Sequence, residues 1–163
     1  MDFSQSLRGF HPVTGKLWLE DVGYMSREEI SIVPKGENMG WRLWEGTYCQ
    51  YTDSSVDSVR SKYVIPQTVP PLLSRVHQDA GGYARSIPGG IFRLGDTSIA
   101  FNNTFIFGDS IFGEVWALNL GGPVGESVID STKIGTTARV VSFDRDSPGH
   151  IFSARLGTVT AAH

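Results

Sequence analysis

Residues 12 to 47 read PVTGKLWLEDVGYMSREEISIVPKGENMGWRLWEGT, and this stretch decides the fold. It holds two strand-length apolar runs, Lys16 to Leu19 and Glu29 to Val33, each bounded by turn residues. Gly15 stands directly before the first run. With the next three residues it gives the pattern glycine, any residue, branched aliphatic, aromatic (Gly15-Lys16-Leu17-Trp18). A glycine in this place suits a turn position with positive φ, and the next two side chains point to opposite faces of a strand. The stretch therefore predicts short strands joined by tight turns.

The same pattern recurs at Gly113-Glu114-Val115-Trp116 and, 36 residues later, at Gly149-His150-Ile151-Phe152. Strands that are apolar on both faces belong between packed sheets, as in the blades of a β-propeller. At roughly 40–50 residues per four-stranded blade, the chain supplies about three to four blades. The longer interval between the first two copies predicts a polar insertion over residues 49–85. We therefore expect residues 1–163 to form one partial, all-β propeller domain.

Five further runs predict strands, at residues 90–94, 104–107, 114–118, 139–143 and 150–154. Helix signals are weak: Leu72 to His77, after Pro70 and Pro71, can hold one helical turn, but Gly81 and Gly82 stop it.

Composition excludes several classes of function. A net charge of -3 gives no general attraction for nucleic acid or an acidic membrane surface. No apolar stretch is long enough to span a bilayer, and residues 1–10 show no signal peptide, so we expect a cytosolic protein or a processed piece. Cys49, the single cysteine, is interpreted as a half-buried unreactive thiol. The four histidines show no metal-ligand spacing and are interpreted as surface or core residues.

Several motifs together resemble one known family. They are Asp21-Val22-Gly23, Glu28-Glu29-Ile30, the run KGENMGW at 35–41, Trp44-Glu45-Gly46, the run IPGGIFRL at 87–94, and the run NTFIFGDSIFGEVWALNL at 103–120. These resemble the glucose/sorbosone dehydrogenase family, six-bladed propellers that include the soluble quinoprotein sugar dehydrogenases. Val140 to Ala154 resembles the closing strand pair, so the chain corresponds to the C-terminal part of the family fold.

The resemblance implies specific site residues. The backbone carbonyls of Gly23 and Tyr24 would hold the calcium that binds the cofactor pyrroloquinoline quinone (PQQ). Glu29 and the carbonyl of Met39 would hold a second, structural calcium, although the acidic pair at 28–29 also fits a solvated strand end. Oxygen ligands of this kind suit calcium.

The resemblance also implies that the chemistry lies elsewhere. The family's catalytic histidine lies upstream of this chain, and Arg139 stands alone where the family has several quinone-binding arginines. We therefore expect no catalytic residue here and no sugar oxidation by the chain alone. Family members are usually periplasmic or secreted.

Two alternatives stay open at this point. Some relatives of this fold, such as the hedgehog-interacting type, bind protein partners without catalysis, and an edge cluster of Trp41, Trp44 and Tyr48 suits contact with a sugar. The exposed ends of a partial ring also need covering, either by the missing blades or by a second copy of the chain.

Overall fold

The computed structural model places every described residue in strands, turns or extended segments. The described residues are 8–50, 67–77, 85–93, 104–121, 127–147, 149–156 and 158–162. No helix within these residues could span a membrane.

The first sheet has four antiparallel strands in the order β1-β2-β3-β6. These are β1 (Arg8–Phe10), β2 (Leu17–Asp21), β3 (Arg27–Val33) and β6 (Leu73–Val76). Trp18 pairs with Ile32, and Glu20 pairs with Ile30, so these four side chains share one face. Asp21 pairs with Glu29 on the opposite face.

The second sheet is also four-stranded and antiparallel, in the order β10-β9-β8-β7. It consists of β7 (Gly90–Arg93), β8 (Thr104–Gly108), β9 (Glu114–Gly121) and β10 (Ser127–Thr136). The central strand β8 is buried along its whole length, whereas β10 is a polar, mostly exposed edge. Both sheets follow chain order from one edge to the other, as propeller blades do.

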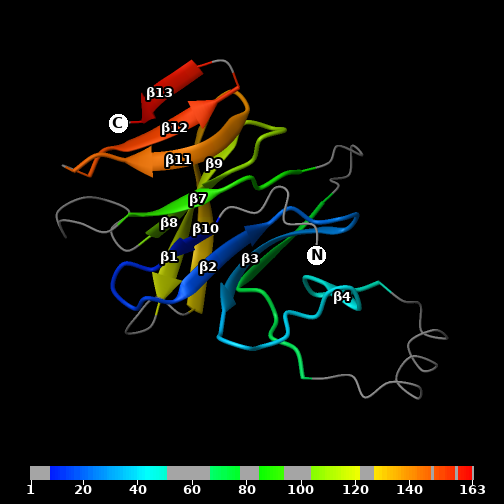
Figure 1. Cartoon of the computed structure of the whole chain (residues 1–163). Helices are drawn as coiled ribbons and strands as arrows, with labels where there is room; N and C mark the ends of the chain where they lie inside the picture. Colours follow the sequence, from blue (N-terminus) through cyan, green and yellow to red (C-terminus); the bar gives the residue numbers. More distant parts are fainter. Residues whose placement is uncertain are drawn as a thin grey trace.

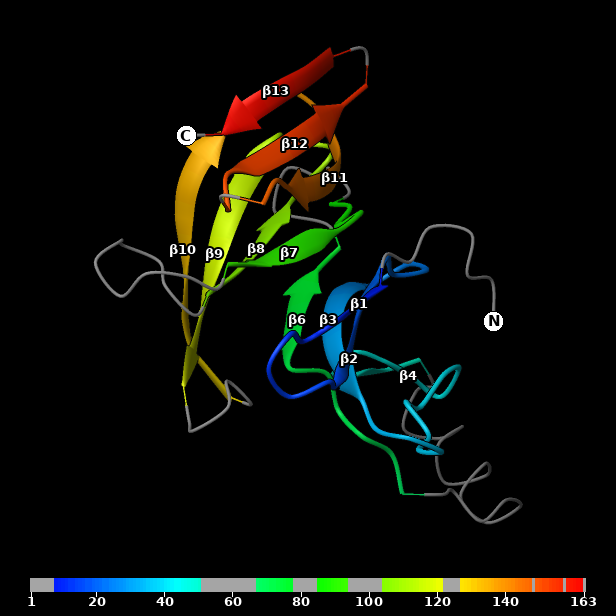
Figure 2. The same cartoon turned by 60° about the vertical axis from the view of Figure 1, so that its left-hand side comes forward.

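A third sheet contains β11 (Val140–Arg145), β12 (Ile151–Arg155) and β13 (Thr158–Ala162). It lies against the second sheet, where β11 contacts β7 and β8, and Figures 1 and 2 both show it beyond the second sheet as seen from the first. A short hairpin of β4 (Trp44–Glu45) and β5 (Tyr48–Cys49) lies beside the first sheet (Figure 1).

The main core lies between the first two sheets. Its buried members are Trp18, Ile30, Ile87, Phe92, Phe105, Phe107 and Leu118. Arg75 of β6 also crosses this interface, since its guanidinium carbon lies 3.8 Å from the centroid of the Trp116 ring and its Nη2 donates to Ser131. Aromatic packing and one cation–π contact therefore join the two sheets.

The glycine pattern and the strands it predicted are confirmed. Gly15, Gly113 and Gly149 all have positive φ, at 66°, 65° and 96°, and a strand follows each of them within two residues. All seven predicted runs are strands. The fold is all-β, as expected.

The helical turn considered at Leu72 to His77 was wrong. Leu73–Val76 is β6, whose residues pair with β3 from Arg27 to Ile30. The edge of β3 offers a row of unpaired backbone groups, and pairing with it outweighs the weak local helix signal. The range 49–85, predicted as an insertion, therefore contains the outer strand of the first sheet; residues 51–66 and 78–84 lie outside the described part.

Candidate functional site

The β2–β3 turn (residues 22–26) carries Gly23 and Tyr24, the two positions that the sequence singled out, and Glu45 holds it from one side. Glu45 is buried at the end of β4. Its Oε1 accepts hydrogen bonds from three consecutive amides, those of Met25 (2.9 Å), Ser26 (2.7 Å) and Arg27 (3.0 Å). Burial opposes ionisation, but these amides outweigh it and lower the pKa of Glu45 below its usual value.

Glu28 holds the same turn from the other side. Its carboxylate is fully buried, and Oε1 accepts a hydrogen bond from the Gly23 amide at 3.3 Å. Oε2 accepts one from the Ile87 amide at 2.7 Å, which ties the turn to the segment that leads into the second sheet. Burial raises the pKa of Glu28, while the Ile87 amide and the imidazole of His77 oppose the rise.

Gly23 is required by close packing. A Cβ at this position would lie 1.5 Å from the carbonyl oxygen of Arg27 and 2.7 Å from Oε1 of Glu45. Amides of the turn point to the two carboxylates, and within the described residues no backbone amide donates to the carbonyl of Gly23 or Tyr24. Within the described residues, these two carbonyl oxygens therefore have no backbone partner.

Acidic side chains gather on the face of the first sheet that points away from the second. Asp21 pairs with Glu29 across β2 and β3, and Glu29 accepts a backbone hydrogen bond from Gly46. Burial and the neighbouring Asp21 raise the pKa of Glu29 to about 7. Burial and Glu45 likewise raise the pKa of Asp21. In the described part of the chain, no three His, Cys, Asp or Glu side chains lie close enough together to form a metal cluster.

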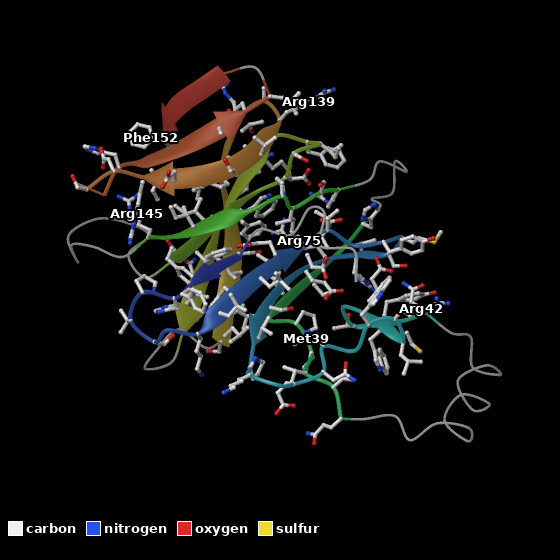
Figure 3. All side chains as sticks on the ribbon, viewed as in Figure 1. Met39, Arg42, Arg75, Arg139, Arg145 and Phe152 are labelled. Atoms are coloured by element: carbon white, nitrogen blue, oxygen red, sulfur yellow. The ribbon has the colours of Figure 1, made fainter. Side chains whose placement is uncertain are left out.

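Met39, the other predicted calcium position, lies in the loop between β3 and β4. Figure 3 shows Met39 and Arg42 on the side of the first sheet where the β4–β5 hairpin lies, whereas Arg75 lies at the middle of the molecule. The loop is fixed by hydrogen bonds at its neighbours, from Gly40 N to the Asn38 side chain and from Val69 N to Asn38 O. Glu29 and Met39 thus come from a strand and from the loop that follows it.

The aromatic side chains near the turn differ from the predicted cluster. Trp41 is 44% exposed and lies against Tyr24, which is 72% exposed, with ring centroids 6.0 Å apart and planes at 73°. Trp44 instead lies against Gly40, where an added Cβ would meet its Cβ at 3.1 Å. The exposed aromatic pair therefore consists of Tyr24 and Trp41.

Sequence reasoning missed three residues of this site, namely Glu28, Glu45 and His77. Glu45 stands in the quoted Trp44-Glu45-Gly46 motif, which was a usable signal. Glu28 stands in the quoted acidic pair. Successive side chains of a strand point to opposite faces, so Glu28 lies on the buried face of β3 and Glu29 on the other face. His77 is hydrogen-bonded to Glu28 from 49 positions away, and no local pattern reveals such a pair.

Comparisons with known proteins agree with this architecture. No protein-family profile matches the sequence. A solved glucose dehydrogenase structure aligns with 90% of this chain, with a TM-score of 0.66 and 18% sequence identity. It is similarly superposed on the soluble aldose sugar dehydrogenase of Escherichia coli in its apo form (TM-score 0.61, 20% identity, 90% of this chain). A third match is the PQQ-bound aldose sugar dehydrogenase of Streptomyces coelicolor (TM-score 0.60, 13% identity, 91% of this chain).

The fold is that of the soluble sugar dehydrogenases. The sequence of this chain is similar to that of the HIPL1 protein of Arabidopsis thaliana. The two are 32% identical over 100 residues, which are 60% of this chain. The HIPL2 protein of the same plant is 29% identical over 131 residues, which are 78% of this chain. The chain spans 14% and 18% of the lengths of these two proteins and 36% to 40% of the three solved structures. The predicted resemblance and the β-propeller fold class are thus confirmed.

Proposed function

We propose that this chain is part of a sugar-dehydrogenase-type propeller and contributes a calcium-binding turn to it. The observation that carries the proposal is the β2–β3 turn, in which Glu45 and Glu28 bind the amides, while no described backbone amide donates to the Gly23 or Tyr24 carbonyl. Carbonyl and carboxylate oxygens are the ligands that calcium prefers. The residues present therefore fit a calcium ion, with Glu29 and Met39 as a second position.

We propose that the described residues do not hold PQQ by themselves. Its three carboxylates need cationic partners, ideally planar guanidinium groups. Arg75 is occupied by Trp116 and Ser131, and Arg85 is occupied by Asp109 and Glu114. Arg139 is exposed at the start of the third sheet (Figure 3). We propose that the quinone-binding cations and the catalytic base belong to blades outside this chain, so that the chain alone does not oxidise sugars.

Calcium binding is tested by calorimetric titration of the whole chain and by thermal unfolding with and without calcium. Binding to the folded state raises the midpoint as the free calcium concentration increases. The effect should be lost in Glu45→Ala and kept in Glu37→Ala, which removes an exposed carboxylate of the β3–β4 loop. No heat of binding and no midpoint shift in millimolar calcium would show that the turn is not a calcium site.

A non-catalytic binding propeller is the second candidate, and the exposed Tyr24–Trp41 pair favours it. Large exposed aromatic side chains suit a carbohydrate or protein partner. Under this alternative, the isolated chain binds a partner in the absence of calcium and quinone. A calcium-free pull-down against glycans and candidate proteins separates the two functions, because retention that requires Trp41 but not calcium supports the second.

The remaining blades or a second copy would complete the ring. A repeated sheet stack is covered most simply by further sheets of the same kind. Sedimentation at several concentrations tests the second copy, and a constant mass of 17.8 kDa would exclude it.

A further inference from the structure

The imidazole of His11 holds the turn that joins β1 to β2. Its Nδ1 lies 3.2 Å from the amide nitrogen of Val13 and 3.2 Å from that of Thr14. The main chain closes the same turn, since the His11 amide donates to Lys16 O and the Gly15 amide donates to His11 O, both at 2.8 Å. Amides only donate, so Nδ1 is the acceptor in both side-chain contacts, and the proton of the neutral ring is on Nε2.

The same ring belongs to the aromatic core between the first two sheets. It is 7% exposed and packs on Phe92 of β7, with ring centroids 4.6 Å apart and planes at 65°. The ring of Trp18 in β2 lies 6.4 Å away on the side of the first sheet. One imidazole therefore serves both the β1–β2 turn and the contact between the sheets.

Strand β1 depends on this turn for its place in the sheet. It has three residues, Arg8–Phe10, lies at the edge of the first sheet and pairs with β2. So short a hairpin is weak by itself, because few ladder hydrogen bonds hold it. Opening the turn therefore frees the innermost strand of the first sheet.

Protonation removes what the His11 ring contributes to the turn. An imidazolium carries hydrogen on both nitrogens, so the amides of Val13 and Thr14 would face an N–H group instead of an acceptor. Burial also opposes the charge and lowers the pKa of His11 below its usual value of 6.5. Acid therefore favours a form of the chain in which the ring has left the turn.

Within the described residues, no charged side chain offsets the burial of His11. On β2, the ionisable side chain that shares the Trp18 face is Glu20, whose pKa is raised to about 8, so it stays neutral in acid. On β7, Arg93 follows Phe92 and points to the opposite face of the strand. In the turn itself, Lys16 meets His11 through its main-chain carbonyl.

The other two described histidines have the opposite kind of contact. Nδ1 of His77 lies 2.7 Å from Oε1 of Glu28, and Nδ1 of His150 lies 2.8 Å from Oδ2 of Asp146. A carboxylate stabilises an imidazolium, so protonation of the ring keeps these contacts. His11 is the described histidine whose contacts require the neutral ring.

We propose that His11 is an acid-sensitive switch: its protonation opens the β1–β2 turn, withdraws the imidazole from Phe92 and loosens the packing of the first sheet on the second. The switch acts in mildly acidic surroundings and reverses when the ring loses its proton. It depends on neither calcium nor a quinone, and so goes beyond the proposed function.

Nuclear magnetic resonance of the ¹⁵N-labelled whole chain, from about pH 7.5 to about pH 4.5, tests the switch. At the neutral end the His11 ring should show the Nε2–H tautomer. Between about pH 7 and about pH 5, the hydrogen-exchange protection factors of the Val13 and Thr14 amides should fall about tenfold or more, because the open turn takes a proton that the closed turn refuses. The Gly149 and His150 amides, which donate to Asp146, are the internal reference and should keep their protection.

His11→Asn is the matched variant, because an asparagine side-chain oxygen can accept the same amides and does not titrate. It also removes a core ring, so we expect lower stability than wild type at neutral pH. The stability difference between wild type and His11→Asn should shrink as the pH falls from about 7 to about 5, since only wild type loses a neutral buried imidazole. The difference between wild type and His150→Asn should hold or grow. Glu20 is present in all three proteins, so its own pH dependence cancels in these differences.

Three outcomes would overturn the proposal. They are constant protection of the Val13 and Thr14 amides throughout the titration, parallel stability curves for wild type and His11→Asn, and titration of the His11 ring without any change at the two amides. Each would leave His11 with a purely structural role in the turn. If His11→Asn does not fold, the exchange and tautomer measurements on the wild-type chain decide alone.

Discussion

The rings of Trp18 and Phe92 lie 4.8 Å apart at 85°, and this edge-on contact joins β2 of the first sheet to β7, an edge strand of the second. Phe105 lies against both rings, 5.1 Å from Trp18 and 4.9 Å from Phe92. Perpendicular and tilted aromatic pairs of this kind add specific attraction to the burial of large apolar surfaces. The first two blades are therefore expected to unfold together.

Trp18→Ala should cost about 3–5 kcal/mol of unfolding free energy, because it empties a large volume between the two sheets. Trp41→Ala is the matched control, since it removes the same side chain from an exposed position and should cost less than about 1 kcal/mol. Urea denaturation followed by circular dichroism measures both. Equal losses in the two variants would contradict a core centred on Trp18.

Gly23→Ala should distort the β2–β3 turn, because its new Cβ would meet the carbonyl oxygen of Arg27 at 1.5 Å. We expect a loss of at least about 1–3 kcal/mol together with weaker calcium binding. Gly9→Ala is the control, since a Cβ there has nothing within 4 Å. A Gly23→Ala protein with wild-type stability and calcium affinity would show that the turn tolerates a side chain.

Glu45→Ala should leave the amides of Met25, Ser26 and Arg27 without their acceptor and cost at least about 2 kcal/mol. Glu45→Gln keeps an acceptor oxygen and should lose less. Hydrogen exchange at these three amides gives a local readout, with exchange faster in Glu45→Ala than in Glu45→Gln. Unchanged protection in Glu45→Ala would mean that another group binds the amides.

Glu20 should make the protein less stable as the pH rises. Burial raises the pKa of Glu20 to about 8 from 4.5, and its Oε2 has no hydrogen-bond partner among the described residues. Between these pH values the folded state holds a proton that the unfolded state has released, so the free energy of unfolding falls as the pH increases through this window. Glu29, with a pKa raised to about 7, acts in the same direction.

Glu20→Gln stays neutral at every pH and should show a shallower decline than wild type when unfolding is measured from about pH 5 to pH 8. The difference should grow toward the alkaline end. Parallel stability curves for the two proteins would show that Glu20 is not a buried neutral acid.

The apolar strands could be predicted because each of them carries its own turn signals and core residues. Gly113 and Gly149 mark their turns through the backbone conformation that only glycine adopts easily. By contrast, β10 was missed because its face is polar and exposed, so no alternation of apolar residues marks it. Leu73–Val76 was missed because its strand conformation depends on pairing with β3 rather than on its own sequence.

The site was only partly predictable for a related reason. Resemblance pointed to Gly23, Tyr24, Glu29 and Met39, which are short-range features of one segment. The groups that hold the turn act across the fold, with Glu45 about twenty positions from the amides that it binds and Ile87 59 positions from Glu28. Such contacts depend on how the strands align with one another, and no local pattern in a single sequence reveals this alignment.

The side chains of Glu45 and Glu28 hold the β2–β3 turn by accepting hydrogen bonds from its amides. The oxygens that we propose as calcium ligands at Gly23 and Tyr24 belong to the main chain, so a change of side chain at position 24 leaves the proposed ligating group in place. A substitution of Tyr24 therefore reports little on calcium binding, whereas Gly23→Ala changes the conformation of the turn itself. A carboxylate at position 45 is the more informative feature to compare, because Glu45 accepts the three amides that fix the shape of the turn.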